Sequence, residues 1–193
     1  MGSEGSPGRS PRSPRKARRG LGPAAAFVLL AGAAAAQQLT RDEALALAFP
    51  GAAVAAEQLF LTRDQQRLAA ERGGVEIPSA LVARYVATKA GQVVGRAYVD
   101  TSTVRTKKET LLIFLDGTGR VTRVEVTAFL EPAEYRPPAA WLRQYNGRPL
   151  TDDLGVNKAI RPIAGATLTG RAVNTAVRRV LAVDSVLRDG GRP

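Results

Sequence analysis

The sequence predicts an α+β domain: N-terminal helices, an antiparallel sheet of two or more hairpins, and a C-terminal amphipathic helix. One observation predicts the helices and a second predicts the strands. Apolar residues recur with helical spacing near both ends of the domain, within 40–73 and 167–187. Between these ends, within 81–129, apolar and polar residues alternate with a period of two, which is typical of strands with one buried face. Helices and strands that are segregated along a chain indicate the α+β class.

Two short helices are predicted at the start of the domain because each begins with a capping box. In a capping box, a Thr is followed three residues later by Glu or Gln, and the two side chains satisfy backbone N–H groups of the first turn. The pairs are Thr40 with Glu43 and Thr62 with Gln65. Pro-Gly at 50–51 and Gly-Gly at 73–74 end these helices. The stretch 53–61 between them is either a short strand or an extended link.

Two hairpins follow, each with a glycine-containing turn between its alternating strands. The expected strands are residues 81–88, 93–99, 110–115 and 121–129. Gly91 lies in the first turn, and Asp-Gly-Thr-Gly at 116–119 forms the second. The charged segment 103–109 joins the hairpins. It is either a solvated loop or a lip over a negatively charged cofactor.

An aromatic pair follows a proline-rich loop. The loop, residues 131–138, contains three prolines and is not expected to form regular structure. Trp141 and Tyr145 then lie four residues apart, which places them together on a short helix. Either they anchor the loop on the sheet, or one of them contacts the flat ring of a ligand.

The segment 161–170 reads Arg-Pro-Ile-Ala-Gly-Ala-Thr-Leu-Thr-Gly and is predicted to be a tight turn that enters the last helix. The helix has an apolar stripe that faces a core. Its members are Ala172, Val173, Ala176, Val177, Val180, Leu181 and the pair Ser185-Val186. Four charged residues are expected off this stripe, namely Arg171, Arg178, Arg179 and Asp184.

The start of this helix is the candidate binding site. A helix N-terminus offers free backbone N–H groups and the positive end of the helix dipole, and a Thr hydroxyl adds a polar group; together they suit a phosphate. The candidate residues are Gly165, Ala166, Thr167, Leu168 and Thr169. The structural alternative is that Thr167 or Thr169 simply caps the helix.

Composition excludes several kinds of site. The chain has 193 residues, no Cys and no His. Disulfides, iron–sulfur clusters and thiol catalysis are therefore excluded, and the usual haem ligand, most zinc sites and a Ser-His triad are absent. A redox role would need an organic cofactor, and a flavin meets that restriction. A hydrolase that uses Ser79 or Ser185 would lack a base partner.

The N-terminal region resembles a secretory signal peptide in its layout. A basic stretch at 1–20 precedes an apolar run at 21–33, and three alanines at 34–36 give a small-x-small cleavage site. The alternative is an uncleaved membrane anchor, for which the apolar run is short. The expected organisation is a signal peptide or basic N-region at 1–36, an N-terminal helical part at 37–80 and a binding domain at 81–193.

The net charge is +11, of which residues 1–36 contribute +5 through six basic residues and one acidic residue. The remaining basic excess favours an anionic membrane surface or an acidic redox partner. Nucleic acid is not an expected partner, because the chain is predicted to be exported and has no cluster of aromatic residues.

The string 164–169, Ala-Gly-Ala-Thr-Leu-Thr, and the helix that continues it resemble the FMN-binding domain family of the flavoprotein subunits of Rnf-type and sodium-pumping quinone oxidoreductase complexes. In that family an Asp-x-x-Ser/Thr-Gly-Ala-Thr motif carries FMN through a phosphoester bond to its last Thr, which matches Thr167. The resemblance spans about residues 81–187.

The resemblance implies an exported FMN-binding electron-transfer protein, an electron carrier or a subunit of an oxidoreductase complex and not a stand-alone enzyme. It would be located in the periplasm or on the outer face of the cytoplasmic membrane. The implied partners are a flavin transferase for maturation and redox proteins such as a membrane oxidoreductase complex.

The motif departs from the family pattern at two positions. Arg161 stands where the family has Asp, and Ala164 stands where it has Ser or Thr. An Arg at that position could pair with a phosphate directly. The departures also support an alternative function, an exported binding or assembly domain that is related to the FMN-binding domains and has no cofactor.

Overall fold

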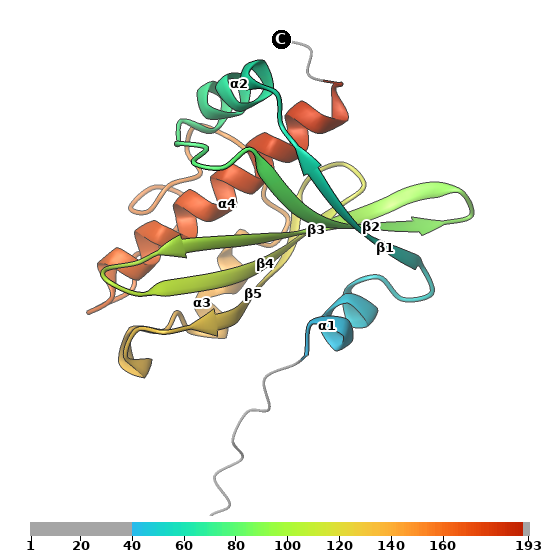
Figure 1. The fold of residues 1–193 in the computed structure, drawn as a ribbon. Helices are drawn as coiled ribbons and strands as arrows, with labels where there is room; N and C mark the ends of the chain where they lie inside the picture. The colour runs from blue at the N-terminus through green and yellow to red at the C-terminus, as the bar shows by residue number, and fades with distance from the viewer. Residues whose placement is uncertain (1–39, 191–193) are drawn as a thin grey trace, which may run out of the picture. The chain divides into compact units, whose positions relative to one another are not determined.

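The computed structural model describes residues 40–190, so the predicted signal peptide lies outside the described residues. The described chain forms one five-stranded antiparallel sheet with helices on both faces (Figure 1). The strands are β1 (Ala53–Phe60), β2 (Leu81–Lys89), β3 (Gln92–Thr103), β4 (Lys108–Asp116) and β5 (Val121–Phe129). The helices are α1 (Arg41–Ala48), α2 (Arg63–Gly73), α3 (Ala139–Leu142) and α4 (Thr167–Arg188), with 3₁₀ turns η1 (Ala133–Tyr135) and η2 (Arg143–Tyr145). The predicted α+β class is confirmed.

The strands lie in the sheet in their chain order, so every neighbouring pair is antiparallel. β1, for which the sequence left two alternatives, is a strand. It pairs with β2 along its whole length, from Ala53 opposite Thr88 to Phe60 opposite Leu81. A strand from the segment 37–80 therefore belongs to the same sheet as the two predicted hairpins.

The two faces of the sheet bury two separate sets of apolar side chains, as the period of two requires. The larger core lies between the sheet and α4. It contains Tyr98, Leu111, Ile113, Leu115, Val121, Val124 and Val126 from the sheet, and Val173, Ala176, Val177, Val180 and Leu181 from α4. The smaller core lies under α1 and contains Ala44, Leu45, Phe49, Ala87, Ala97, Leu112 and Phe114.

Both predicted capping boxes are present. The Thr40 hydroxyl accepts a hydrogen bond from the Glu43 N–H (3.3 Å), and the Glu43 carboxylate accepts one from the Thr40 N–H (2.8 Å). Thr62 and Gln65 form the same reciprocal pair at the start of α2. These local signals were sufficient to predict where both helices begin.

One expectation for α4 is wrong. Asp184, expected off the apolar stripe, is buried, because α4 is enclosed by the sheet and by other segments such as α2. One of its carboxylate oxygens accepts hydrogen bonds from Arg96 Nε (2.5 Å) and from the Tyr98 hydroxyl (2.8 Å). The other oxygen accepts from Arg188 Nε at 2.8 Å. The charge is thus compensated inside the core.

Gly95 on β3 has no room for a side chain. A Cβ at this position would overlap Phe49 Cε1 and would lie 2.7 Å from the backbone oxygen of Leu115 on β4. Because the strand backbone cannot rotate away, we expect Gly95→Ala to lower the free energy of unfolding by about 1–3 kcal/mol in urea denaturation. Gly155→Ala is the control, since the nearest atom to a Cβ at this position would be in the flexible Lys158 side chain, 3.4 Å away. An equal effect of the two variants would contradict this interpretation.

Candidate functional site

The candidate site lies where the chain turns into α4. Gly165 has a φ of +75°, a left-handed conformation that favours glycine, and it turns the chain toward the helix. Ala166 is the residue before the first helical turn, and its carbonyl accepts a bond from the Gly170 N–H at 3.0 Å. The helix therefore begins at Thr167, within the segment that the sequence predicted to be a tight turn entering it.

No side chain caps this helix. Ala166 occupies the capping position, so the alternative in which Thr167 or Thr169 caps the helix is wrong. Within residues 40–190, no acceptor is bonded to the backbone N–H groups of Thr167, Leu168 and Thr169. Three free N–H groups at the positive end of a 22-residue helix favour an anion.

All five predicted site residues line one hollow of about 250 Å³, together with Arg105 and Tyr135. The Arg105 guanidinium lies over the Tyr135 ring, 5.2 Å from its centroid. Arg105 belongs to the turn between β3 and β4, within the segment 103–109. The structure therefore brings one cation of this segment, Arg105, to the site.

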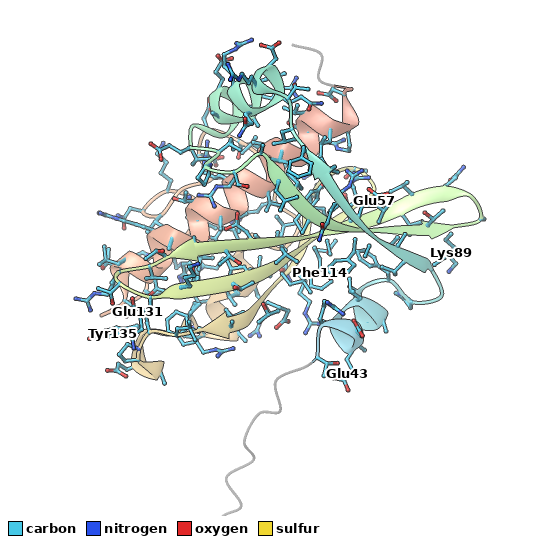
Figure 2. All side chains as sticks on the ribbon, in the orientation of Figure 1. Glu43, Glu57, Lys89, Phe114, Glu131 and Tyr135 are labelled. Carbon is cyan, nitrogen blue, oxygen red and sulfur yellow. The ribbon has the colours of Figure 1, made fainter. Side chains whose placement is uncertain are left out.

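Glu131 holds this turn in place. Its carboxylate accepts hydrogen bonds from the backbone N–H groups of Arg105 (3.2 Å), Thr106 (2.8 Å) and Lys107 (2.9 Å). These bonds, above all those from Thr106 and Lys107, lower the pKa of Glu131. Figure 2 shows Glu131 and Tyr135 at the same end of the sheet. Glu131 and Tyr135 come from the proline-rich loop, for which the sequence had no signal of a role in the site.

Arg161 does not line this hollow, although the sequence placed it in the motif. Its backbone is bound by Trp141 and Gln144. The carbonyl accepts from Trp141 Nε1 (2.6 Å), and the N–H donates to the Gln144 side chain (2.9 Å). Arg161 instead lines a separate hollow of about 600 Å³ together with Trp141 and Arg148. Arg105 is thus the cation of the candidate site.

Trp141 and Tyr145 do lie together, with ring centroids 5.7 Å apart and an edge-to-face angle of 76°. Tyr145 is fully buried, and its hydroxyl donates to the Asn174 side chain on α4 (3.3 Å). Trp141 is half-buried, and a Cβ at Gly170 would lie 3.6 Å from its ring. The pair therefore anchors the loop against the start of α4, whereas the sequence alternative had placed this anchor on the sheet.

A second hollow, of about 330 Å³, lies farther along α4, where Val180 and Val183 contribute to its wall. Val180 lies eleven residues after Thr169, a distance of about 16 Å along the helix axis. Arg179 in this hollow donates two hydrogen bonds to Asp100, at 3.0 and 2.8 Å. The positive charge of Arg179 is thus already paired with a carboxylate, whereas the N–H groups at the start of α4 have no acceptor within residues 40–190.

Within residues 40–190, no cluster of acidic residues is arranged to bind a metal ion. No helix in this part of the chain has both the length and the apolar character to cross a membrane. Comparisons with protein-family models, with curated proteins and with solved structures found no match to this chain.

Proposed function

We propose that the chain is an exported FMN-binding electron-transfer protein, with the flavin attached by a phosphoester bond to Thr167. The supporting observation is that three groups suited to a phosphate ester lie around one hollow. These groups are the free N–H groups at the start of α4, the exposed Thr167 and the Arg105 guanidinium.

The hollow suits the phosphate end of FMN. Backbone N–H groups and a planar guanidinium are strong donors to phosphate oxygens. Gly165 and Ala166 have little or no side chain, so they leave the approach to these donors open. About 250 Å³ is less than the 300–1,000 Å³ of pockets that enclose a whole drug-sized ligand, so the site accommodates the phosphate and not the ring system.

Burial distinguishes the two threonines. Thr167 is exposed, whereas Thr169 is 1% exposed. Of the two threonines, Thr167 is therefore the one that is open to a modifying enzyme. A flavin transferase that uses a flavin adenine dinucleotide would break the pyrophosphate bond, join Thr167 Oγ to the phosphorus on the flavin side, and release AMP and the hydroxyl proton.

FMN would supply reversible electron transfer, and the residues described above would hold its phosphate. The proposed donors and acceptors are redox partner proteins, such as a membrane oxidoreductase complex. The proposed location is the periplasm or the outer face of the cytoplasmic membrane. The alternative proposal, an exported binding or assembly domain without a cofactor, is favoured by Arg161, which replaces the acidic residue of the motif and lines a different hollow.

The test is the flavin fluorescence that stays with the denatured chain on a gel, after expression with an exported flavin transferase. We expect Thr167→Ala to abolish this signal, because the exposed threonine hydroxyl at the site is lost. Thr167→Ser, which keeps a hydroxyl, and Thr169→Val, which keeps the buried shape, should retain it.

The intact mass measures the same bond independently, as an added FMN on the wild-type chain that is missing from Thr167→Ala. Flavin that dissociates on denaturation would contradict the ester bond but not FMN binding. A colourless wild-type protein from cells that flavinylate other exported proteins would overturn the flavin proposal and favour the cofactor-free alternative.

A further inference from the structure

β1 is an edge strand without the usual protection. In the described part of the chain, β1 pairs only with β2, so its outer N–H and C=O groups have no strand partner. Proteins usually protect such edges with Lys, Pro, a bulge or a very short strand. β1 is eight residues long, reads Ala-Val-Ala-Ala-Glu-Gln-Leu-Phe, and keeps a regular register with β2 throughout. Nothing in this strand opposes the addition of another strand.

The opposite edge of the sheet is different. At the start of β5, the Val121 N–H donates to the Arg148 carbonyl (3.0 Å), and the Val121 carbonyl accepts from the Gly147 N–H (2.6 Å). The segment around η2 thus covers part of that edge. β1 is therefore the edge of this sheet that is open for pairing.

The only charged residue on β1 is already neutralised. Glu57, labelled in Figure 2, accepts a hydrogen bond from Arg84 Nε of β2 at 2.8 Å. The edge therefore presents no unpaired charge to an incoming strand, and like-charge repulsion does not prevent association of two such edges.

One end of β1 carries an exposed aromatic residue and the other end borders an apolar groove. Phe60 is 75% exposed. A groove of about 400 Å³ lies between α1 and β1, and Phe49, Val54, Ala56 and Tyr85 are among the residues that line it. Residues 54, 56 and 60 share one face of the strand because side chains alternate. The exposed ring and the groove thus lie on the same face, at opposite ends of one strand.

Symmetry restricts how two copies of β1 can pair. When a two-fold axis relates two antiparallel edge strands, the same sheet face of both copies lies on the same side. Even-numbered residues of one copy therefore lie opposite even-numbered residues of the other, and odd-numbered residues lie opposite odd-numbered ones. A centre at Glu57 would place two carboxylates opposite each other, which is unfavourable. A centre at Ala56 places Glu57 opposite the partner's Ala55. It also places Phe60 opposite the partner's Ala52, which lines the groove.

We propose that two copies of this chain form a dimer through antiparallel pairing of their β1 strands about Ala56, with Phe60 of each copy in the α1–β1 groove of the other. The pairing would extend each sheet into one continuous ten-stranded sheet across the two copies. It would satisfy the open backbone edge and bury both exposed rings. The dimer does not depend on FMN, because β1 contributes no residue to the flavin site.

Cysteine cross-linking tests the register directly, because the chain has no Cys of its own. Opposed residues in antiparallel strands have Cα atoms about 4.5–5.5 Å apart, within the range of a disulfide. The full-length Ala56→Cys variant should therefore form a covalent dimer on mild oxidation. Gln58→Cys is the matched control: its two copies would be displaced by four residues, about 13 Å, and should not cross-link. Mixing Val54→Cys with Gln58→Cys should restore a cross-link.

Sedimentation equilibrium of the full-length chain tests the role of the ring. Phe60→Ser should raise the dimer dissociation constant about 100-fold, since each dimer loses two buried rings. Leu130→Ser is the control, because Leu130 is 60% exposed and lies just beyond the end of β5. A wild-type chain that stays monomeric at about 100 μM, a concentration that detects even weak dimers, would overturn the proposal. A cross-link through Gln58→Cys instead of Ala56→Cys would overturn it too.

Discussion

Asp184→Ala is expected to lower the free energy of unfolding by about 3–5 kcal/mol, because it removes the counter-charge of a buried guanidinium. The Asp184 side chain is 1% exposed and that of its partner Arg96 is 7% exposed, with 2.5 Å between the carboxylate and Arg96 Nε. Tyr98 would lose its acceptor as well. Burial, and then the Asp184 charge, raise the pKa of Tyr98, so its hydroxyl remains a donor at neutral pH. Urea denaturation at pH 7 measures the loss.

Asp189→Ala is the matched control. Asp189 also pairs with an Arg, at 2.7 Å from Arg72, but its side chain is half exposed to water. Such pairs contribute at most about 1 kcal/mol. If Asp184→Ala destabilised the protein no more than this control, the buried pair would not hold α4 on the sheet.

Two buried ion pairs between β3 and α4 run in opposite directions. In one, the strand supplies Arg96 and the helix supplies Asp184; in the other, the strand supplies Asp100 and the helix supplies Arg179. A displacement of α4 along the sheet would separate both pairs or bring like charges together. We infer that this arrangement specifies the position of α4, and therefore the position of the candidate site at its start.

Local signals were sufficient to predict most of the elements. The capping boxes at Thr40 and Thr62 identified the first two helix starts, and the period of two identified the paired strands of both hairpins. These features depend on residues within a few positions of each other. The Gly-Ala-Thr turn likewise indicated where the helix beginning at Thr167 starts.

The sequence offered the segment 103–109 as a possible lip but did not single out Arg105 or Glu131, because both come from distant parts of the chain. Arg105 is 60 positions before Gly165, and it reaches the hollow only because Glu131 binds the turn in which it lies. Arg161, much closer in sequence, is held away by Trp141. The burial of Asp184 was also missed, since helical spacing predicts one buried face, whereas α4 is enclosed on more than one.

Glu109→Gln is expected to stabilise the protein by about 3 kcal/mol at pH 8 and to change little at pH 4. Glu109 is 0% exposed, and within residues 40–190 neither carboxylate oxygen has a hydrogen-bond partner. Burial, and then the charge of Asp100, raise its pKa to about 7. The folded state therefore binds this proton more tightly than the unfolded state, whose pKa is about 4.3. Folding stability should fall as the pH rises between these two values, and above pH 7 the full cost of the buried charge remains.

Urea denaturation of both chains at several pH values between 4 and 8 measures this effect, and the difference between them is the quantity to compare. It should be close to zero at pH 4, where Glu109 is mostly protonated in both states, and should grow up to about pH 7 because only the wild-type chain gains a buried charge. Glu134→Gln is the control: Glu134 is exposed on η1, so its replacement should leave the pH dependence unchanged. A Glu109→Gln chain that keeps the wild-type pH dependence would mean that this carboxylate finds a compensating partner when it ionises, and that its burial does not limit stability at neutral pH.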